Sequence, residues 1–424
     1  MAVSARVLGS PVRVDLDGTL IRSDLLLESL LLLMKRNPLY LFLAVGWLLR
    51  GGKPKLAAEL AARVELNAAA LPYNKDLVAW LRSERNSGRQ LWLCAAADMP
   101  LAERVAQHLE LFDGVIGRDG AVLSVLPVFV TGGSRFRAIL RALRPHQWAK
   151  NVLILVPLFT AHRLGDLDAL AAGLAALVAF CLCASSVYLL NDMLDLEADR
   201  GHPRKSKRPF ASGDLSLATG LVLAPTLLAL AALIAAFLPG KFQLFLAAYY
   251  ALTFTYSVKL KRMLLVDAVA LAGLYTLRIM AGAGAVSVPL SFWLLLFSVF
   301  LFLSLAFVKR YAELDALRRQ QRLQALGRGY RVEDLAVLQS FGTASGYLSV
   351  LVLALYINSP EIEPLYHRPK AIWMLCVLML YWISRVWMTA HRGGMHDGPV
   401  VYALRDRVSL GIGLLAAITV AVAI

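Results

Sequence analysis

The chain has 424 residues, of which 58% are hydrophobic and only 17% are charged, and its mean hydropathy is +0.62. Because about a quarter of the residues of a soluble domain are charged, these values exclude an ordinary cytosolic enzyme and predict a membrane protein. The net charge of +15 is expected from basic loops on one side of a membrane rather than from nucleic-acid binding. The four cysteines lack the spacing of a metal site, and we expect them to be reduced packing residues.

Charged residues are frequent in the first third of the chain, which predicts a small α/β domain over residues 1–135. Residues 11–20 read as a short strand followed by the acidic motif D-x-D-G-T. This motif suits phosphoryl transfer, with Asp15 as nucleophile and Mg²⁺ ligand, Asp17 as acid or base, and Thr19 in the phosphate loop. It resembles the first motif of haloacid dehalogenase-like hydrolases.

The remainder of that resemblance is incomplete. Ala95 stands in the next candidate strand, residues 90–98, where the family carries a hydroxyl group, and residues 120–164 contain no Asp or Glu. A phosphatase is therefore one alternative for this region. A truncated, vestigial domain that serves folding, docking or regulation is the interpretation we prefer. The first residues lack a long apolar core, so we expect no signal peptide and a cytoplasmic location for this domain.

Residues 25–50 are apolar, but charged residues and a proline divide them into pieces shorter than the about 20 residues of a membrane span. We therefore predict helices that lie on the N-terminal domain or on the membrane surface. An additional span here would also move the acidic motif to the other side of the membrane.

Long apolar runs recur through the rest of the chain and predict an all-α polytopic membrane bundle over residues 141–424. The runs indicate about nine transmembrane helices, at residues 148–162, 168–190, 216–238, 242–257, 264–286, 289–308, 336–357, 371–390 and 408–424. The loops after the even-numbered helices contain 18 Lys and Arg residues, and the opposite loops contain 4. The positive-inside rule then places the even loops and the N-terminal domain on the cytoplasmic side of a cell (inner) membrane.

The loop after the second predicted helix contains the motif N-D-x-x-D-x-x-x-D, formed by Asn191, Asp192, Asp195 and Asp199. On a continuing helix the three carboxylates fall within about 60° of one another. Like charges on one stripe repel unless a cation joins them, and hard oxygen ligands favour Mg²⁺ together with phosphate oxygens of a substrate. The spacing therefore predicts that the three aspartates are catalytic Mg²⁺ ligands, with a solvated turn as the alternative.

Basic and polar residues follow this motif and recur at the predicted membrane boundaries, where Lys and Arg suit the oxygens of a diphosphate. The candidates for substrate binding are Asn191, Arg144, Lys150, Asn151, Arg200, Lys205, Arg208, Tyr256, Lys259, Lys261, Arg278, Lys309 and Arg310. For the cations among them, the alternatives are topology signalling and interfacial snorkelling.

Asp267 and Arg278 are eleven residues apart and share a helical face inside a predicted span. Charged residues there are costly unless they are paired or functional, so they form an ion pair or line the substrate cavity. Asp267 would then be a catalytic residue, as a second metal ligand or a base near the acceptor.

Taken together, these motifs resemble the UbiA superfamily of intramembrane prenyltransferases over residues 141–424. The stretches that carry the resemblance, besides the aspartate motif, are residues 144–151, 256–261 with Asp267, 277–282 and 309–313. They look most like the branch that contains decaprenyl-phosphate phosphoribosyltransferase. The resemblance implies Mg²⁺-dependent displacement of pyrophosphate, with phosphoribosyl transfer from phosphoribosyl pyrophosphate to a polyprenyl phosphate in the lipid bilayer. The residues point to no particular protein partner.

One departure from the superfamily bears on the substrate. Many members carry a second D-x-x-x-D motif, whereas here Asp267 is followed four residues later by Leu271. The positive Arg278 in that region suits a donor with an extra phosphate, such as phosphoribosyl pyrophosphate. The alternatives are prenyl transfer from a prenyl diphosphate to an aromatic or isoprenoid acceptor, a transporter or lipid-binding scaffold, and phosphatase activity of the N-terminal domain.

Overall fold

The computed structural model describes residues 11–95, 99–117, 134–202, 204–321, 329–360, 362, 365–395 and 398–424. The chain divides into two compact units. The first unit comprises Met1–Arg144 and Tyr188–Thr226, and the second comprises Pro145–Val187 and Leu227–Ile424. The segment with the three aspartates therefore belongs to the same unit as the N-terminal residues, which differs from the predicted division into residues 1–135 and 141–424.

The first unit contains a small parallel sheet, consistent with the predicted α/β region. Its strands lie in the order β1 (Val12–Asp15), β2 (Leu91–Ala95) and β3 (Gly114–Gly117). In the register of the first pair, Val14 is opposite Leu93, and both side chains are fully buried. Strands that are buried in this way read as continuous apolar runs in the sequence, which is why they were predictable.

The acidic motif follows β1 as the sequence predicts. Asp15 ends the strand and is buried, Asp17 Oδ1 accepts a hydrogen bond from the Leu25 N–H at 3.2 Å, and Thr19 is half-buried. β2 ends at Ala95, and residues 96–98 and 118–133 lie outside the described residues. The sheet itself is thus observed, and a haloacid dehalogenase-like active site stays a prediction.

The first two helices of this unit, α1 (Leu25–Arg36) and α2 (Tyr40–Ala61), span residues 25–50, which were predicted to form surface helices. The helices that lie wholly within the described residues of this unit are α1, α2, α3 (Lys75–Asn86), α4 (Met99–Leu109), α5 (Arg135–Leu143) and α8 (Leu196–Arg200), with 3-10 turns η1 (Ala68–Ala70) and η3 (Lys205–Lys207). Asp24 caps α1 through the Leu27 N–H, and α2 is kinked at Gly51 and Gly52. Neither α1 nor α2 is among the candidate spans of the described chain, in agreement with the prediction.

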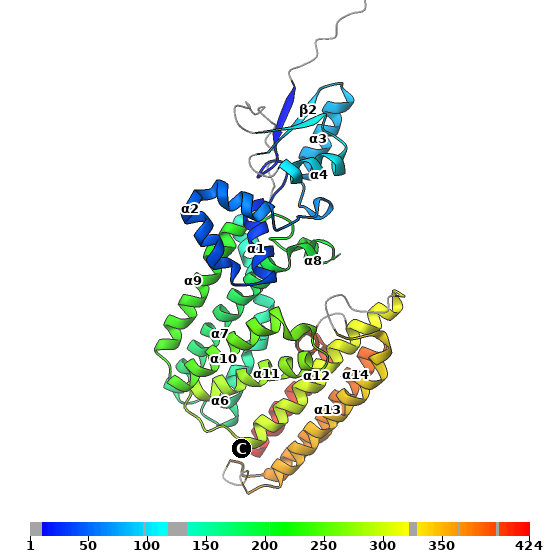
Figure 1. Cartoon of the computed structure of the whole chain (residues 1–424). Helices are drawn as coiled ribbons and strands as arrows, with labels where there is room; N and C mark the ends of the chain where they lie inside the picture. The colour runs from blue at the N-terminus through cyan, green and yellow to red at the C-terminus, as the bar shows by residue number, and fades with distance from the viewer. Residues whose placement is uncertain are drawn as a thin grey trace, which may run out of the picture. The chain divides into compact units, whose positions relative to one another are not determined.

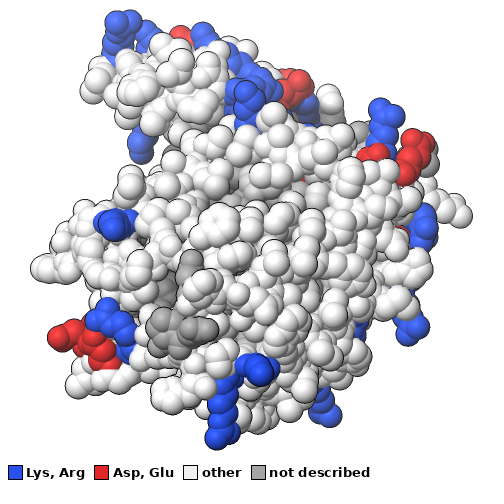
Figure 2. All heavy atoms as spheres, turned by 90° about the horizontal axis from the view of Figure 1, so that it is seen from below, with Lys and Arg blue, Asp and Glu red and all other residues white. Residues whose placement is uncertain are grey.

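Six helices of the described chain are long and apolar enough to cross a membrane. They are α7 (Leu167–Leu194), α9 (Leu217–Ala236), α11 (Val266–Ala285), α12 (Phe292–Arg319), α13 (Leu335–Ile357) and α14 (Trp373–His391). A seventh results if α15 (Pro399–Arg405) and α16 (Arg407–Ala423), which meet at 80°, form one span. Figure 2 shows a face on which uncharged residues cover most of the surface, as membrane-spanning helices require.

The predicted count of nine spans is not confirmed, and two segments account for the difference. Residues 148–162 form the 3-10 helix η2 (Pro145–Leu155) and the five-residue helix α6 (Val156–Thr160), which are too short for a span. Helix α10 (Gly240–Val258) has 19 residues, but its Tyr, Thr and Gln side chains lower its hydropathy, and it is not among the candidates. Short 3-10 turns also occur at η4 (Leu260–Arg262), η5 (Val332–Asp334) and η6 (Pro369–Ile372).

In the second unit, α11 lies between α10 and α12, while α13 packs along both α12 and α14 (Figure 1). Helix α11 is rich in Ala and Gly, so neighbouring backbones approach it closely. At Gly282, an added Cβ atom would lie 1.9 Å from the Ile154 carbonyl oxygen of η2. The small residue is therefore required where the two segments touch.

Replacing Gly282 with alanine is expected to lower the free energy of unfolding by about 1–3 kcal/mol, because the backbone of η2 must move away. The measurement is the thermal midpoint of the purified protein in detergent. Gly411→Ala in α16 is the matched control, since nothing lies within 4 Å of a Cβ atom there. Equal midpoints for the two variants would contradict the close approach at Gly282.

Candidate active site

The aspartate-rich segment, residues 191–200, is nearly but not fully continuous as a helix. Helix α7 ends at Leu194, and α8 begins at Leu196, because Asp195 has a non-helical backbone with φ −107° and ψ 19°. The Asp195 N–H still bonds to the Asn191 carbonyl at 3.0 Å, and the Asp199 N–H bonds to the Asp195 carbonyl at 2.8 Å. The break therefore turns Asp195 away from the predicted stripe without separating Asp192 from Asp199.

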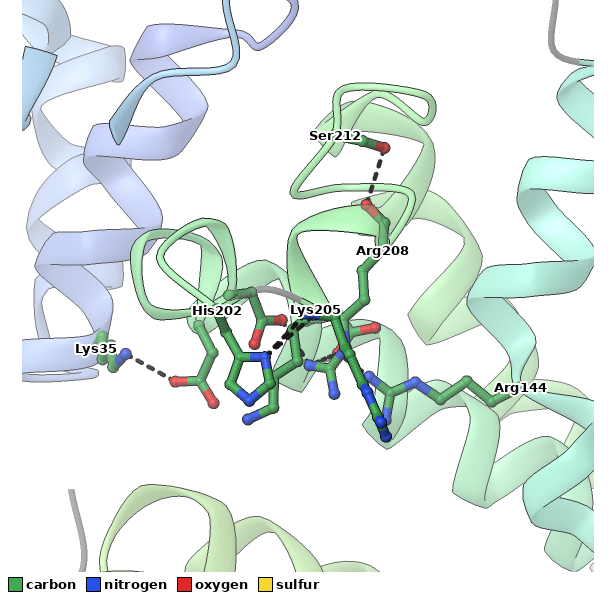
Figure 3. Close-up of polar contacts among 10 residues, drawn as sticks. Lys35, Arg144, His202, Lys205, Arg208 and Ser212 are labelled. Carbon is green, nitrogen blue, oxygen red and sulfur yellow. Dashed lines mark hydrogen bonds and ion pairs between the residues drawn. The ribbon is translucent and has the colours of Figure 1, made fainter. Parts of the chain in front are cut away.

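Asp192 and Asp199 are brought together by arginines. Each is only 2% exposed. Arg208 Nη1 lies 3.0 Å from Asp192 Oδ1 and 2.5 Å from Asp199 Oδ2. Arg144, which follows α5 in a left-handed conformation, pairs with the same Asp192 Oδ1 and has its guanidinium 5.3 Å above the Tyr188 ring. Figure 3 shows the guanidinium groups of Arg144 and Arg208 converging on one place.

Asp195 is engaged by a different element. Its Oδ1 atom lies 2.8 Å from Nζ of Lys35, in the last turn of α1 (Figure 3). Across the described parts of the chain, no three Asp, Glu, His or Cys side chains gather closely enough to hold one metal ion. The structure thus unites two of the three predicted ligands.

The chemistry of the pair still fits Mg²⁺, which prefers carboxylate oxygens and completes its shell with phosphate oxygens and water. Asp192 and Asp199 already share one positive group, the guanidinium of Arg208. A Mg²⁺ ion bound by both carboxylates would have to replace this guanidinium.

The basic loop after the aspartates is held by local contacts. The Arg208 carbonyl accepts a hydrogen bond from Ser212 Oγ at 3.0 Å. His202 Nδ1 accepts bonds from the N–H groups of Arg204 and Lys205 at 3.2 and 3.4 Å. Desolvation and the nearby Lys205 ammonium lower the pKa of His202, so its neutral ring is the acceptor at pH 7. Lys205 itself is exposed to solvent.

A second polar cluster lies in the second unit around Asp267, in the first turn of α11. Asp267 is fully buried, and its Oδ2 atom lies 2.6 Å from Nε of Arg310, which is 1% exposed. Tyr330 donates to Asp267 Oδ1 at 2.6 Å, and burial together with this bond raises the pKa of Tyr330. Arg310 also bonds to Glu313 at 2.5 Å and to the Tyr256 hydroxyl at 3.0 Å. This carboxylate is therefore neutralised by an arginine from α12.

Arg278 belongs to another cluster, so of the two alternatives for Asp267 and Arg278 the ion pair between them is not what the structure shows. Its guanidinium donates to Asn151 Oδ1 at 2.9 Å, to the Leu274 carbonyl at 2.6 Å and to the Tyr249 hydroxyl at 3.0 Å. Arg278 and Asn151 are both buried. The structure therefore joins two predicted residues that are far apart in the sequence, and the three groups to which Arg278 donates these bonds are neutral.

The remaining predicted substrate-binding residues lie at helix ends, in 3-10 turns and, for Lys309, inside α12. Arg200 is turned towards Glu28 of α1, with contacts of 2.5 and 3.0 Å. Asn191 lies in the last turn of α7. Lys259 is exposed, and the half-buried lysines are Lys150, Lys261 and Lys309.

Several residues of these clusters escaped prediction, namely Glu28, Lys35, Tyr249 and Tyr330. The only available signal was a charged residue in or at the end of an apolar run for Glu28 and Lys35, and an aromatic residue in such a run for Tyr249. Tyr330 lies between Gly329 and Arg331 and gave no such signal.

Comparison with known proteins defines the class. The model of the UbiA prenyltransferase family matches residues 152–403. The chain therefore belongs to the UbiA prenyltransferase family, it is a transferase, and the predicted resemblance is confirmed.

Among its relatives, y4nM of Sinorhizobium fredii is 33% identical over 96% of this chain and 90% of that protein. A decaprenyl-phosphate phosphoribosyltransferase of Mycobacterium tuberculosis is 32% identical over 67% of this chain and 94% of that protein. The fold is similar to that of a UbiA homolog from Archaeoglobus fulgidus bound to DMAPP and Mg²⁺. For that structure the TM-score is 0.51 and the identity 16%, over 67% of this chain and 97% of that one.

Proposed function

We propose that this chain is a Mg²⁺-dependent transferase that moves the phosphoribosyl group of phosphoribosyl pyrophosphate to a polyprenyl phosphate. The observation that carries the proposal is the convergence of Arg144 and Arg208 on two buried aspartates, which suits a polyanionic donor bound with a divalent cation. The similarity to the mycobacterial phosphoribosyltransferase, over nearly all of that protein, supports this choice of donor.

The chemistry assigns a role to each group. Asp192 and Asp199 would hold the Mg²⁺, with Asp195 as a third ligand, and the ion supplies charge neutralisation for the pyrophosphate. Arg144 and Arg208 would turn from the carboxylates to the phosphate oxygens, and this electrostatic stabilisation is expected to be the largest catalytic contribution. An acceptor phosphate oxygen attacks the anomeric carbon, the bond from that carbon to the pyrophosphate oxygen breaks, and pyrophosphate leaves with the electron pair. The acceptor is already an anion, so no strong base is required.

The contacts of Asp267 favour a role other than metal binding. Both of its carboxylate oxygens are engaged, one by Arg310 and the other by Tyr330. A second Mg²⁺ would have to displace a buried arginine. We therefore propose one metal site in the aspartate-rich segment, and a positioning role for Asp267.

An apolar cavity supports a lipid substrate. It has a volume of about 1340 Å³ and lies within the second unit, between α6, α12, α13, α14 and α16. Its lining includes Leu294, Leu301 and Leu378. An isoprenoid chain fits such a lining, because burial of each methylene group contributes about 0.8 kcal/mol. With the loop charges, this favours a lipid-facing body whose basic loops and N-terminal domain face the cytoplasm of an inner membrane.

Donor profiling tests the proposed activity. Purified protein in lipid nanodiscs with Mg²⁺ and decaprenyl phosphate is expected to release pyrophosphate from phosphoribosyl pyrophosphate and to form a phosphoribosylated lipid. The matched reaction contains geranyl diphosphate and an aromatic acceptor. Pyrophosphate release in that reaction alone would overturn the proposal.

Prenyl transfer is the second candidate function, since the fold is shared with the DMAPP-bound homolog. That likeness extends to the fold only, so the donor arms decide between the two. Lipid binding that persists in Asp192→Ala, with no turnover of any donor by the wild type, would instead favour a lipid-binding scaffold. Loss of phosphatase activity in Asp15→Asn, with transfer intact, would assign a separate activity to the N-terminal domain.

A further inference from the structure

Helix α1 lies outside the residues matched by the family model, yet it contacts the aspartate-rich segment through a buried ion pair. Glu28 accepts two bonds from Arg200, at 2.5 Å from Nη1 and 3.0 Å from Nη2. Both side chains are buried, at 4% and 7% exposure. Ser23 Oγ donates to Glu28 at 2.7 Å, and Arg200 Nε donates to the Ala211 carbonyl at 3.2 Å. A bidentate pair with these extra bonds fixes the orientation of α8.

A second ion pair lies two turns further along the same face of α1. Lys35 follows Glu28 by seven residues, so the two side chains project in the same direction. Lys35 Nζ lies 2.8 Å from Asp195 Oδ1, five residues before Arg200, and this pair is about one third exposed, at 32% and 27%. One face of α1 therefore binds Asp195, at the break between α7 and α8, and Arg200, the last residue of α8.

The loop that carries Arg208 is also fitted against the N-terminal residues. Gly213 has a φ of +77°, and an added Cβ atom there would lie 2.5 Å from the Arg22 Cβ atom and 2.7 Å from its carbonyl oxygen. Arg141, in α5, bonds to Asp214 at 3.0 Å. These contacts and the two ion pairs belong to one compact unit.

We propose that α1 is a positioning element of the transferase, in which Glu28 fixes α8 and thereby Asp199, while Lys35 is the counter-ion that a divalent cation displaces from Asp195. The inference rests on the proposed function for the metal site and for the identity of the reaction, whereas the contact of Glu28 with α8 is independent of both. A buried pair that loses one partner leaves an uncompensated charge, whereas a partly exposed pair is readily exchanged. Glu28 is therefore suited to hold α8 in place. Lys35 is suited to be displaced from Asp195 by a divalent cation.

Glu28→Gln in the full-length protein tests the positioning role. Hydrogen exchange of the backbone amides of residues 192–202 is expected to accelerate by about tenfold or more, because local opening of α8 becomes easier. The Kd for Mn²⁺ without any donor, measured by titration calorimetry, is expected to rise by about tenfold for the same reason. Glu59→Gln is the matched control, since Glu59 in the last turn of α2 pairs with Arg63 just beyond that helix. Exchange rates that match those of the control would overturn the positioning role.

The double variant Glu28→Gln, Arg200→Gln separates the ion pair from a general loss of stability. Its Mn²⁺ affinity should be no weaker than that of Glu28→Gln alone, because the two substitutions remove one shared interaction. If the losses of Mn²⁺ affinity in the two single variants add up in the double variant, Glu28 and Arg200 do not act through their ion pair.

Lys35→Met tests the counter-ion role and is expected to act in the opposite direction. Removal of the resident ammonium should lower the Kd for Mn²⁺ by about threefold to tenfold. Arg36→Met removes the same charge from the next residue, whose guanidinium bonds instead to the Arg63 carbonyl at 3.0 Å. Equal tightening in both variants would reveal a general field effect and overturn the role of Lys35.

The hydrogen-exchange and Mn²⁺-binding measurements distinguish this inference from the proposed function. Hydrogen exchange requires neither metal nor donor, so it decides the positioning role even if phosphoribosyl pyrophosphate proves to be inactive. A wild-type Mn²⁺ affinity that Asp192→Ala does not change would overturn the proposed metal site and, with it, the counter-ion role of Lys35.

Discussion

Replacing Asp192 with asparagine is expected to lower turnover by about 10²–10³-fold while the protein remains folded. Asp192 is 2% exposed, and its Oδ1 atom is shared by Arg144 and Arg208. Asparagine keeps the shape and one acceptor oxygen but removes the charge that would bind Mg²⁺. The measurements are the initial rate of pyrophosphate release and the Kd for Mn²⁺, and both should change together.

Asp214→Asn is the matched control for this effect. Asp214 belongs to the same compact unit and also pairs with an arginine, Arg141, at 3.0 Å, but it lies in the loop beyond Arg208. The same change of charge there should leave turnover within about threefold, because an exposed ion pair contributes little. Turnover of Asp192→Asn at the level of this control would contradict a catalytic role for the aspartate-rich segment.

Arg310→Met is expected to have the largest effect on stability, lowering the free energy of unfolding by about 3–5 kcal/mol. The substitution removes the guanidinium that neutralises Asp267, and the carboxylate stays fully buried with its hydrogen bond from Tyr330. The thermal midpoint in detergent should fall sharply. Asp267→Asn combined with Arg310→Met should recover part of the loss, because no unpaired charge remains at this pair.

Arg318→Met controls for the loss of an arginine from α12. Arg318 pairs with Asp315 at 2.6 Å, but its side chain is 53% exposed, so solvent can compensate for the change. We expect a change in the free energy of unfolding of about 1 kcal/mol or less. If Arg310→Met and Arg318→Met unfold at the same temperature, the buried pair does not stabilise the second unit as argued.

The pairing of Asp267 shows that helical periodicity predicts which residues share a face but not which side chains meet. Asp267 and Arg278 do share a face of α11, as their spacing indicates. Eleven residues correspond to about 16 Å along the helix axis, however, which is too far for the two side chains to meet. Asp267 therefore pairs across helices with Arg310, and Arg278 is held by Asn151 and Tyr249.

The aspartate-rich segment shows the same limit at closer range. Spacing alone indicated that Asp192 and Asp199 are neighbours, and the structure brings them to one guanidinium. The non-helical backbone at Asp195 was not predictable, because Asp195 is bound by Lys35, which lies 160 residues earlier in the chain.

Local patterns were sufficient for the membrane class, most of the long helices, the acidic loop after β1 and the family. Those features depend on hydropathy and on the spacing of residues within a few turns of one another, and both can be read from the sequence. Tertiary structure decided which charges meet: Arg208 between two aspartates, Arg310 on Asp267, and α1 on the aspartate-rich segment. These pairs join residues between 9 and 172 positions apart in the chain. Their partners are selected by the cost of burying an unpaired charge, which depends on the folded arrangement as a whole.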